Sequence, residues 1–296
     1  MAEAIVRRVD HLVVRVHSPE PMFKLLTQQL LLPTAWPLTT NPFYTSGGIH
    51  LGNLNLEIMQ VGQQARPARP YGIAFELEPY DMSLPELRAR NIPHTPPMPF
   101  FIVDEQGWQI TAWNNVYLGG LMGDSRAAKL FFSFSQHAPK ETWEQSTFPK
   151  PFNRRFGLPF VFDTVYRNGM VFAVEYNRAW RTLNIKEELA HTGLDVQRVY
   201  EITIGVQEYE RAYDCWKALL EPLPEISKGI WELPDGMHLR LAKRPANGIR
   251  RMIWQVSSLN RAAQFLHKRE MLGKERSGMI SIAPEKIMGL DIRLVQ

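Results

Sequence analysis

The chain has 296 residues, of which 45% are apolar and 22% charged, and its formal net charge is +4. This length predicts two domains, and the composition excludes a disordered chain. Basic residues are mixed with acidic ones in short groups, which argues against a nucleic-acid-binding protein. A single cysteine excludes a disulfide framework and a Cys-rich zinc site. Apolar runs shorter than a membrane span predict a cytoplasmic protein without membrane contact.

In chain order, the first elements are a strand, a helix and further strands. Residues 5–16, IVRRVDHLVVRV, are typical of a strand, and Ser18 followed by Pro19 indicates the start of a helix. Strand-like runs follow at 43–52 and 53–61. A strand, a helix and about three strands therefore form a first structural unit.

The same unit recurs after the Pro- and Arg-rich link at 63–70. Residues 71–79 are typical of a strand and residues 83–91 of a helix. Further strands are predicted at 100–114 and 129–136. The second unit therefore has the same order of elements as the first.

Two more copies of the unit lie near the end of the chain. The third begins with a strand at 199–206 and a helix at 208–222, and the fourth begins with a strand at 250–258. The stretch before them fits no copy, and its length predicts a connector with structure of its own.

Three segments carry a family resemblance, VDHLVVRV at 9–16, SGGIHLGNLNLEIMQV at 46–61 and IAFELE at 73–78. With them, the chain resembles the vicinal oxygen chelate superfamily, which includes glyoxalase I, bleomycin resistance proteins and extradiol dioxygenases. The resemblance implies an α+β fold of four βαβββ modules, paired into two glyoxalase-like domains whose mixed sheets curl into cups. The expected organisation is an N-terminal domain at 1–140 with modules 5–62 and 70–137, a structured connector at 141–195, and a C-terminal domain at 196–296 with modules 198–244 and 249–296.

Two residues of the first module stand where the resemblance places metal ligands. Side chains alternate along a strand, and the apolar set marks the face packed on the helix. His11 and Glu57 fall on the opposite face, toward the cup, and the resemblance implies ligands from the first and last strands of a module. His50 faces the same way and is a third candidate ligand for a divalent Zn, Ni, Mn or Fe ion. The alternative is that His11 is a hydrogen-bonded histidine at a strand end, without a metal.

The other modules do not repeat this pair. In module two, Gly72 takes the place of His11, and Ser133 takes that of Glu57 because 129–136 is predicted to be its last strand. In the C-terminal half, the four ligand places hold one carboxylate and three arginines, which cannot coordinate a cation. They predict either a network of ion pairs or a site for an anionic ligand, and Arg15 and Glu76 could pair similarly. The candidate substrate-binding residues are Arg15, Asn55, Glu76, Ser133, Glu201, Arg240, Arg251 and Arg293.

The predicted function is a metal-assisted enzyme that acts on a small molecule next to a carbonyl group. It would be a lyase or isomerase with Glu57 as the catalytic base. One alternative is a metal-free, non-catalytic binding or resistance protein. The other is a ring-cleaving extradiol dioxygenase, which is less favoured because the resemblance draws its ligands from the second domain, where arginines stand. The expected partner is a small molecule and neither nucleic acid nor membrane, and the sequence is compatible with a homodimer.

Overall fold

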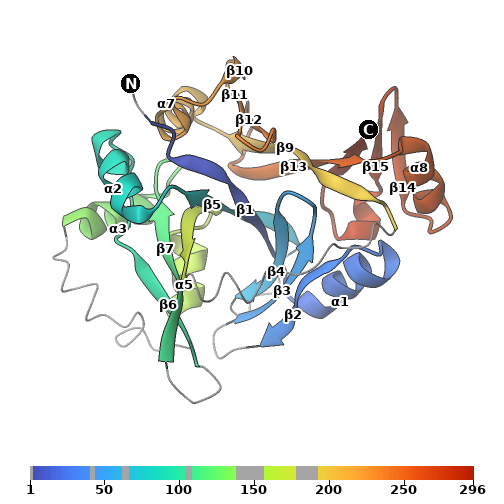
Figure 1. The fold of residues 1–296 in the computed structure, drawn as a ribbon, viewed down its shortest axis with the longest axis horizontal. Helices are drawn as coiled ribbons and strands as arrows, with labels where there is room; N and C mark the ends of the chain where they lie inside the picture. Colours follow the sequence, from blue (N-terminus) through green and yellow to red (C-terminus); the bar gives the residue numbers. More distant parts are fainter. Residues whose placement is uncertain (1–2, 41–43, 62–66, 104–108, 138–156, 178–192) are drawn as a thin grey trace.

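The computed structural model describes residues 3–40, 44–61, 67–103, 109–137, 157–177 and 193–296. These residues form two eight-stranded mixed sheets, each flanked by helices (Figure 1). Among the described helices, none is long and apolar enough to cross a membrane.

The first sheet is built from two βαβββ modules. Module one consists of β1 (Val6–Arg15), α1 (Pro19–Lys24) with the π-helical turn η1 (Leu25–Gln29), β2 (Thr34–Thr40), β3 (Tyr44–His50) and β4 (Asn55–Val61). Module two consists of β5 (Arg69–Leu77), α2 (Tyr80–Ala89), β6 (Met98–Val103), β7 (Gln109–Leu118) and β8 (Met170–Tyr176), with α3 (Arg126–His137) and α5 (Gly157–Thr164) inserted before β8. The strand order is β2-β3-β4-β1-β5-β8-β7-β6. Strands β1 and β5 pair antiparallel at the centre, and β4 and β8 pair with them in parallel.

The last strand of module two is β8, and the strand predicted at 129–136 is wrong. Those residues lie in α3, where Phe132 is 3% exposed and Leu130 is 73% exposed. The two side chains would share one face of a strand, whereas positions two apart point to different sides of a helix. Helix α5 and strand β8 fall within 141–195, the stretch expected to be a connector. Its remaining parts, 141–156 and 178–192, lie outside the described residues.

The second sheet repeats the arrangement in the C-terminal half. Its modules are β9 (Val196–Val206), α7 (Tyr209–Leu220), β10 (Glu225–Ser227), β11 (Ile230–Glu232) and β12 (His238–Lys243), then β13 (Gly248–Val256), α8 (Leu259–His267), β14 (Leu272–Arg276), β15 (Met279–Ile282), the 3-10 helix η2 (Pro284–Ile287) and β16 (Ile292–Val295). The strand order is β10-β11-β12-β9-β13-β16-β15-β14. The predicted α+β fold of four βαβββ modules in two mixed sheets is therefore confirmed.

The two sheets share one apolar core. Side chains of both halves belong to it, and Phe75 of β5 meets Trp216 of α7 edge to face at 6.2 Å. The indole Nε1 of Trp216 donates to the carbonyl of Leu121 at 2.9 Å. The opposite face of each sheet points away from this core. We call these faces the N-terminal cup, which carries His11, Glu57 and Phe172, and the C-terminal cup, which carries Glu201, Arg240, Arg251 and Arg293.

Candidate functional site

A β-bulge in β1 places two polar residues side by side in the N-terminal cup. Val9 pairs with Phe75 and His11 pairs with Ala74, so Asp10 is an extra residue between two consecutive pairs. A bulge bends the strand and re-aims the side chains next to it. Asp10 and His11 are each only 8% exposed. The bulge therefore brings a carboxylate and an imidazole together in a buried place.

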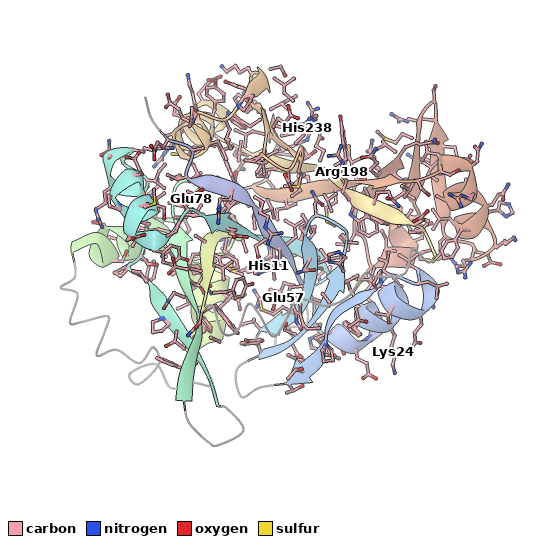
Figure 2. All side chains as sticks on the ribbon, viewed as in Figure 1. His11, Lys24, Glu57, Glu78, Arg198 and His238 are labelled. Carbon is pink, nitrogen blue, oxygen red and sulfur yellow. The ribbon has the colours of Figure 1, made fainter. Side chains whose placement is uncertain are left out.

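The imidazole of His11 lies between two carboxylates. Its Nδ1 is 2.7 Å from Oδ2 of Asp10, and its Nε2 is 3.5 Å from Oε2 of Glu57 on the neighbouring strand β4. His11 and Glu57 lie next to each other in the hollow of the first sheet (Figure 2). The structure thus brings together the two ligand candidates that the sequence predicted from different strands.

Further hydrogen bonds hold both carboxylates. The hydroxyl of Tyr176 on β8 donates to Oδ2 of Asp10 at 2.8 Å, and the hydroxyl of Ser46 on β3 donates to Oε1 of Glu57 at 2.6 Å. The sequence analysis missed Asp10, Tyr176 and Ser46. A signal for Asp10 existed, because the apolar positions Val9 and Leu12 are three residues apart, and this spacing indicates a bulge. Tyr176 had no comparable signal, since its strand was assigned to the connector.

We call Asp10, His11 and Glu57 the polar row. Neighbouring charges and hydrogen bonds shift the pKa values of His11 and Asp10. Burial alone would lower the pKa of His11, but the hydrogen bond and charge of Asp10 and the charge of Glu57 outweigh it and raise the pKa. For Asp10, burial acts to raise the pKa, yet its bonds with His11 and Tyr176 and the charge of Arg8 lower it overall. Asp10 and Glu57 therefore favour the imidazolium form of His11, and His11 in turn favours the carboxylate form of Asp10.

Aromatic side chains from the inserted helices cover the N-terminal cup. Phe132 of α3 and Phe162 of α5 belong to the same buried cluster as Phe172 of β8. The rings of Phe172 and His11 pack in a T-shaped arrangement, with 5.5 Å between ring centroids. The surroundings of the polar row are thus apolar, which strengthens its electrostatic interactions.

Arg15 and Glu76 do not pair with each other, contrary to the expectation. The antiparallel register sets Arg15 opposite Arg69 and Glu76 opposite Arg8, at the two ends of the β1–β5 pair. Arg15, which is 4% exposed, donates from Nη1 to Oδ1 of Asp163 on α5 at 2.9 Å. Glu76 accepts from Nε of Arg8 at 2.8 Å. Arg15 therefore ties the inserted helix to the sheet and does not reach the polar row.

The C-terminal cup carries ion pairs, as the network interpretation expects. Arg240 lies 2.8 Å from Glu201, whose other oxygen accepts from the hydroxyl of Thr203 at 3.0 Å. Arg251 and Arg293 both donate to Asp291, at 2.9 and 3.1 Å. Asp291 was not among the candidate residues of the sequence analysis.

Comparison with solved structures reveals full-length likeness. A variant of 4-hydroxymandelate synthase from Streptomyces coelicolor matches with a TM-score of 0.58 and 9% identity, covering 99% of this chain and 93% of that chain. The 2,3-dioxygenase LapB from Pseudomonas sp. KL28 gives 0.58 and 12%, with the same coverage of 99% and 93%. A Mn(II)-bound glyoxalase from Novosphingobium aromaticivorans gives 0.56 and 8%, covering 99% and 82%. The protein has the vicinal oxygen chelate fold. No family model and no curated protein sequence matches the chain.

The strand register of this vicinal oxygen chelate fold identifies the module-two counterpart of Glu57. Glu57 pairs with Val13 in the parallel pair of β1 and β4, and Phe172 pairs with Ala74 in the equivalent pair of β5 and β8. Val13 and Ala74 occupy the same place relative to the helix that follows, five residues before its N-cap. The counterpart of Glu57 is thus Phe172.

Ser133 was predicted for that place, and this prediction is wrong. It lies on the exposed side of α3, because the segment is helical. The counterpart of His11 is Gly72, as the sequence indicated. Neither Gly72 nor Phe172 has a side-chain atom that could bind a metal, so these two places of module two supply no metal ligand.

The donors present do not fit a catalytic metal site, which usually has three protein ligands. His50 does not join the pair, since its Nδ1 lies 3.0 Å from Oδ1 of Asn55, which faces it across the β3–β4 ladder. In the part of the chain that the structure describes, no three His, Cys, Asp or Glu side chains could hold a metal ion together. His11 and Glu57 thus supply two of the three ligands that such a site needs.

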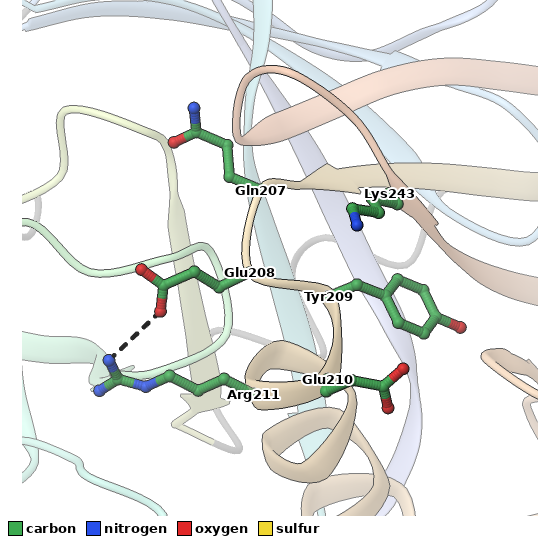
Figure 3. Close-up of a pocket in the computed structure, with 6 residues that line it drawn as sticks. All are labelled: Gln207, Glu208, Tyr209, Glu210, Arg211 and Lys243. Carbon is green, nitrogen blue, oxygen red and sulfur yellow. Dashed lines mark ion pairs between the residues drawn. The ribbon is translucent and has the colours of Figure 1, made fainter.

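An open surface depression lies apart from these groups, where β9 leads into α7 (Figure 3). Glu208 and Arg211 form an exposed ion pair of 3.5 Å there. The depression contains none of the candidate site residues and offers no buried polar group for a ligand. It is lined by Gln207, Glu208, Tyr209, Glu210, Arg211 and Lys243.

Proposed function

We propose that the N-terminal cup binds a small molecule without a divalent metal. The observation that carries this proposal is the ring of Phe172, which packs in a T-shaped arrangement against the imidazole of His11 and stands at the module-two counterpart of Glu57. An aromatic side chain there removes a donor and adds apolar surface for a ligand. This reading favours the metal-free alternative over the metal-assisted enzyme that the sequence predicted.

Unused hydrogen-bonding atoms in the same cup support a ligand. Oδ1 of Asn115 and the hydroxyl of Tyr166 are buried, and neither has a hydrogen-bond partner among the described residues. Buried polar atoms are nearly always paired in native proteins, with protein, water or a ligand. Asn115 lies on β7, two residues before Tyr117 and on the same face of the strand, and the ring of Tyr117 packs against Phe172. The expected ligand is therefore a largely apolar molecule with an acceptor for His11 and a further polar group.

His11 and Glu57 would orient such a ligand. In its imidazolium form, which Asp10 and Glu57 favour, His11 can donate from Nε2 to a carbonyl oxygen of the ligand, and Glu57 can accept from a hydroxyl or amide. Asp10 holds the ring of His11 through Nδ1, so its Nε2 stays aimed into the cup. The buried aromatic cover excludes water from this contact.

A second candidate is a metal-free lyase or isomerase, and the row of Asp10, His11 and Glu57 favours it. Glu57 would remove a proton next to the carbonyl, and His11 would donate one to the carbonyl oxygen as charge develops there. A divalent metal, if bound by His11 and Glu57, would supply Lewis-acid polarisation of the same carbonyl. Ring cleavage with dioxygen needs a redox metal, for which the described donors are too few.

Metal analysis and ligand binding together test the proposal. The purified protein would be dialysed with zinc and manganese and analysed for bound metal, and a panel of small aryl ketones would be screened by ligand-observed NMR. We expect no stoichiometric metal, and ketone binding that is lost in His11→Gln and Glu57→Gln. His50→Gln is the matched control and should bind like the wild type. One equivalent of metal that disappears in His11→Gln would overturn the proposal in favour of a metalloenzyme.

A further inference from the structure

In the C-terminal cup, arginines occupy places where ligands of a metal would converge. The parallel pair of β9 and β12 sets Thr203 opposite Arg240, just as Val13 stands opposite Glu57 in the first sheet. The parallel pair of β13 and β16 sets Ile253 opposite Arg293. Arg251 occupies the place of Gly72, seven residues before the N-cap of the following helix.

The charges of these arginines are only partly neutralised. Glu201 is 4% exposed and is fully engaged by Arg240 and Thr203. Asp291 is shared, because Nε of Arg251 and Nε of Arg293 both donate to it. Two guanidinium groups on one carboxylate leave one positive charge. The terminal nitrogens of Arg251 have no hydrogen-bond partner in the described part of the chain.

The two guanidinium groups are partly sheltered but open to a ligand. The side chains of Arg251 and Arg293 are 28% and 26% exposed. Partial burial strengthens a charge–charge contact relative to one in bulk water. The C-terminal cup thus offers two partly exposed guanidinium groups on the neighbouring strands β13 and β16.

We propose that the C-terminal cup binds an anion, a carboxylate or phosphate group of a small molecule, at the terminal nitrogens of Arg251, with the positive charge of Arg293 beside it. Planar guanidinium groups match the two oxygens of such groups with paired hydrogen bonds. The places that hold candidate metal ligands in the first sheet thus hold arginines in the second sheet, and these suit an anion. This site is separate from the N-terminal cup and does not depend on the function proposed for it.

Titration with simple anions tests the site. Sodium phosphate and sodium acetate would be added separately at constant ionic strength, while arginine Nε–H signals are followed by NMR. We expect saturable shifts of the signals of Arg251 and Arg293, and the tighter of the two anions identifies the preferred group. Arg251→Gln and Arg293→Gln should weaken binding by about tenfold or more. Arg276→Gln, an exposed arginine at the end of β14, is the matched control and should leave the affinity unchanged.

Two further variants make the result decisive. Arg251→Lys keeps the charge and loses the planar fork, so it should bind more weakly than the wild type even if the glutamine variants do not fold. His11→Gln should bind the anion normally, which separates this site from the N-terminal cup. Shifts that do not saturate with either anion, or equal affinity in Arg251→Lys, Arg293→Gln and wild type, would overturn the proposal.

Discussion

Nδ1 of His11 lies 2.7 Å from the carboxylate of Asp10, the residue next to it in the chain. Neighbours in a regular strand point to opposite faces, so only the bulge in β1 allows this contact. The bulge therefore affects the pKa of His11 as well as the position of its ring.

Asp10→Asn should lower the pKa of His11. Without the carboxylate, burial dominates, and burial disfavours the imidazolium. In the wild type, the raised pKa of His11 contributes stability below the unfolded-state value of about 6.5, and this contribution is lost as pH rises through the folded-state pKa. NMR titration of the His11 ring and urea unfolding at several pH values would measure both effects. An unchanged pKa in Asp10→Asn would contradict the assigned hydrogen bond, and Asp235→Asn serves as a carboxylate control in the other half.

His94 should show the opposite pH dependence. Burial lowers its pKa, and the charge of Arg88 adds to this, although Nδ1 donates to the carbonyl of Ile92 at 2.8 Å. The unfolded chain therefore takes up a proton on His94 before the folded protein does. Its contribution to stability is complete above about pH 6.5 and is lost as pH falls toward the folded-state pKa. Unfolding free energies of His94→Gln between pH 5 and 7, compared with wild type, should show a weaker loss toward acid.

Asp163→Ala should destabilise the protein by about 3 kcal/mol, because it leaves the buried guanidinium of Arg15 without its carboxylate. Arg15 also donates to the carbonyl of Val61 and lies over the ring of Tyr71, so it cannot easily turn toward water. Urea denaturation would measure the change. Glu20→Ala removes the carboxylate of an exposed ion pair with Lys24 and should leave stability unchanged. Equal effects of the two substitutions would argue against a buried ion pair at Asp163.

Phe172→His should create a metal site from the existing half-site. It adds a third donor in the place where this fold pairs β8 with β5, next to His11 and Glu57. Calorimetry should detect one equivalent of zinc, and Glu57→Gln in the same chain should abolish the binding. Phe132→His changes another buried ring of the same cluster, on α3, and should bind no zinc. Zinc binding of equal strength in both variants would show that the gain is unspecific.

Much of the fold was already present in the sequence pattern. Alternating apolar residues and four recurring units predicted the modules, because each strand must bury one face against its helix. The same alternation put His11 and Glu57 in the cup. It also identified the places of Gly72, Arg240, Arg251 and Arg293, since these depend only on position within a module.

Tertiary structure decided which segment closes module two. The apolar residues at 129–136 satisfy both a strand period and a helix period, so local pattern could not separate α3 from a strand. Strand β8 follows the insertion in the chain and pairs with β5, which precedes it. The sequence of β8 alone does not indicate which strand it pairs with. For this reason Phe172 and Tyr176 entered the site only with the fold.

By itself, the sequence determined the modules, the facing of their side chains and the half-site of His11 and Glu57. Those properties follow from short-range periodicity. Only the tertiary structure decided that Asp10 contacts His11 and raises its pKa, that Phe172 stands at the counterpart of Glu57 and that Asp291 is shared by Arg251 and Arg293. Each of these depends on contacts across strands or on a bulge, which a one-dimensional pattern does not specify.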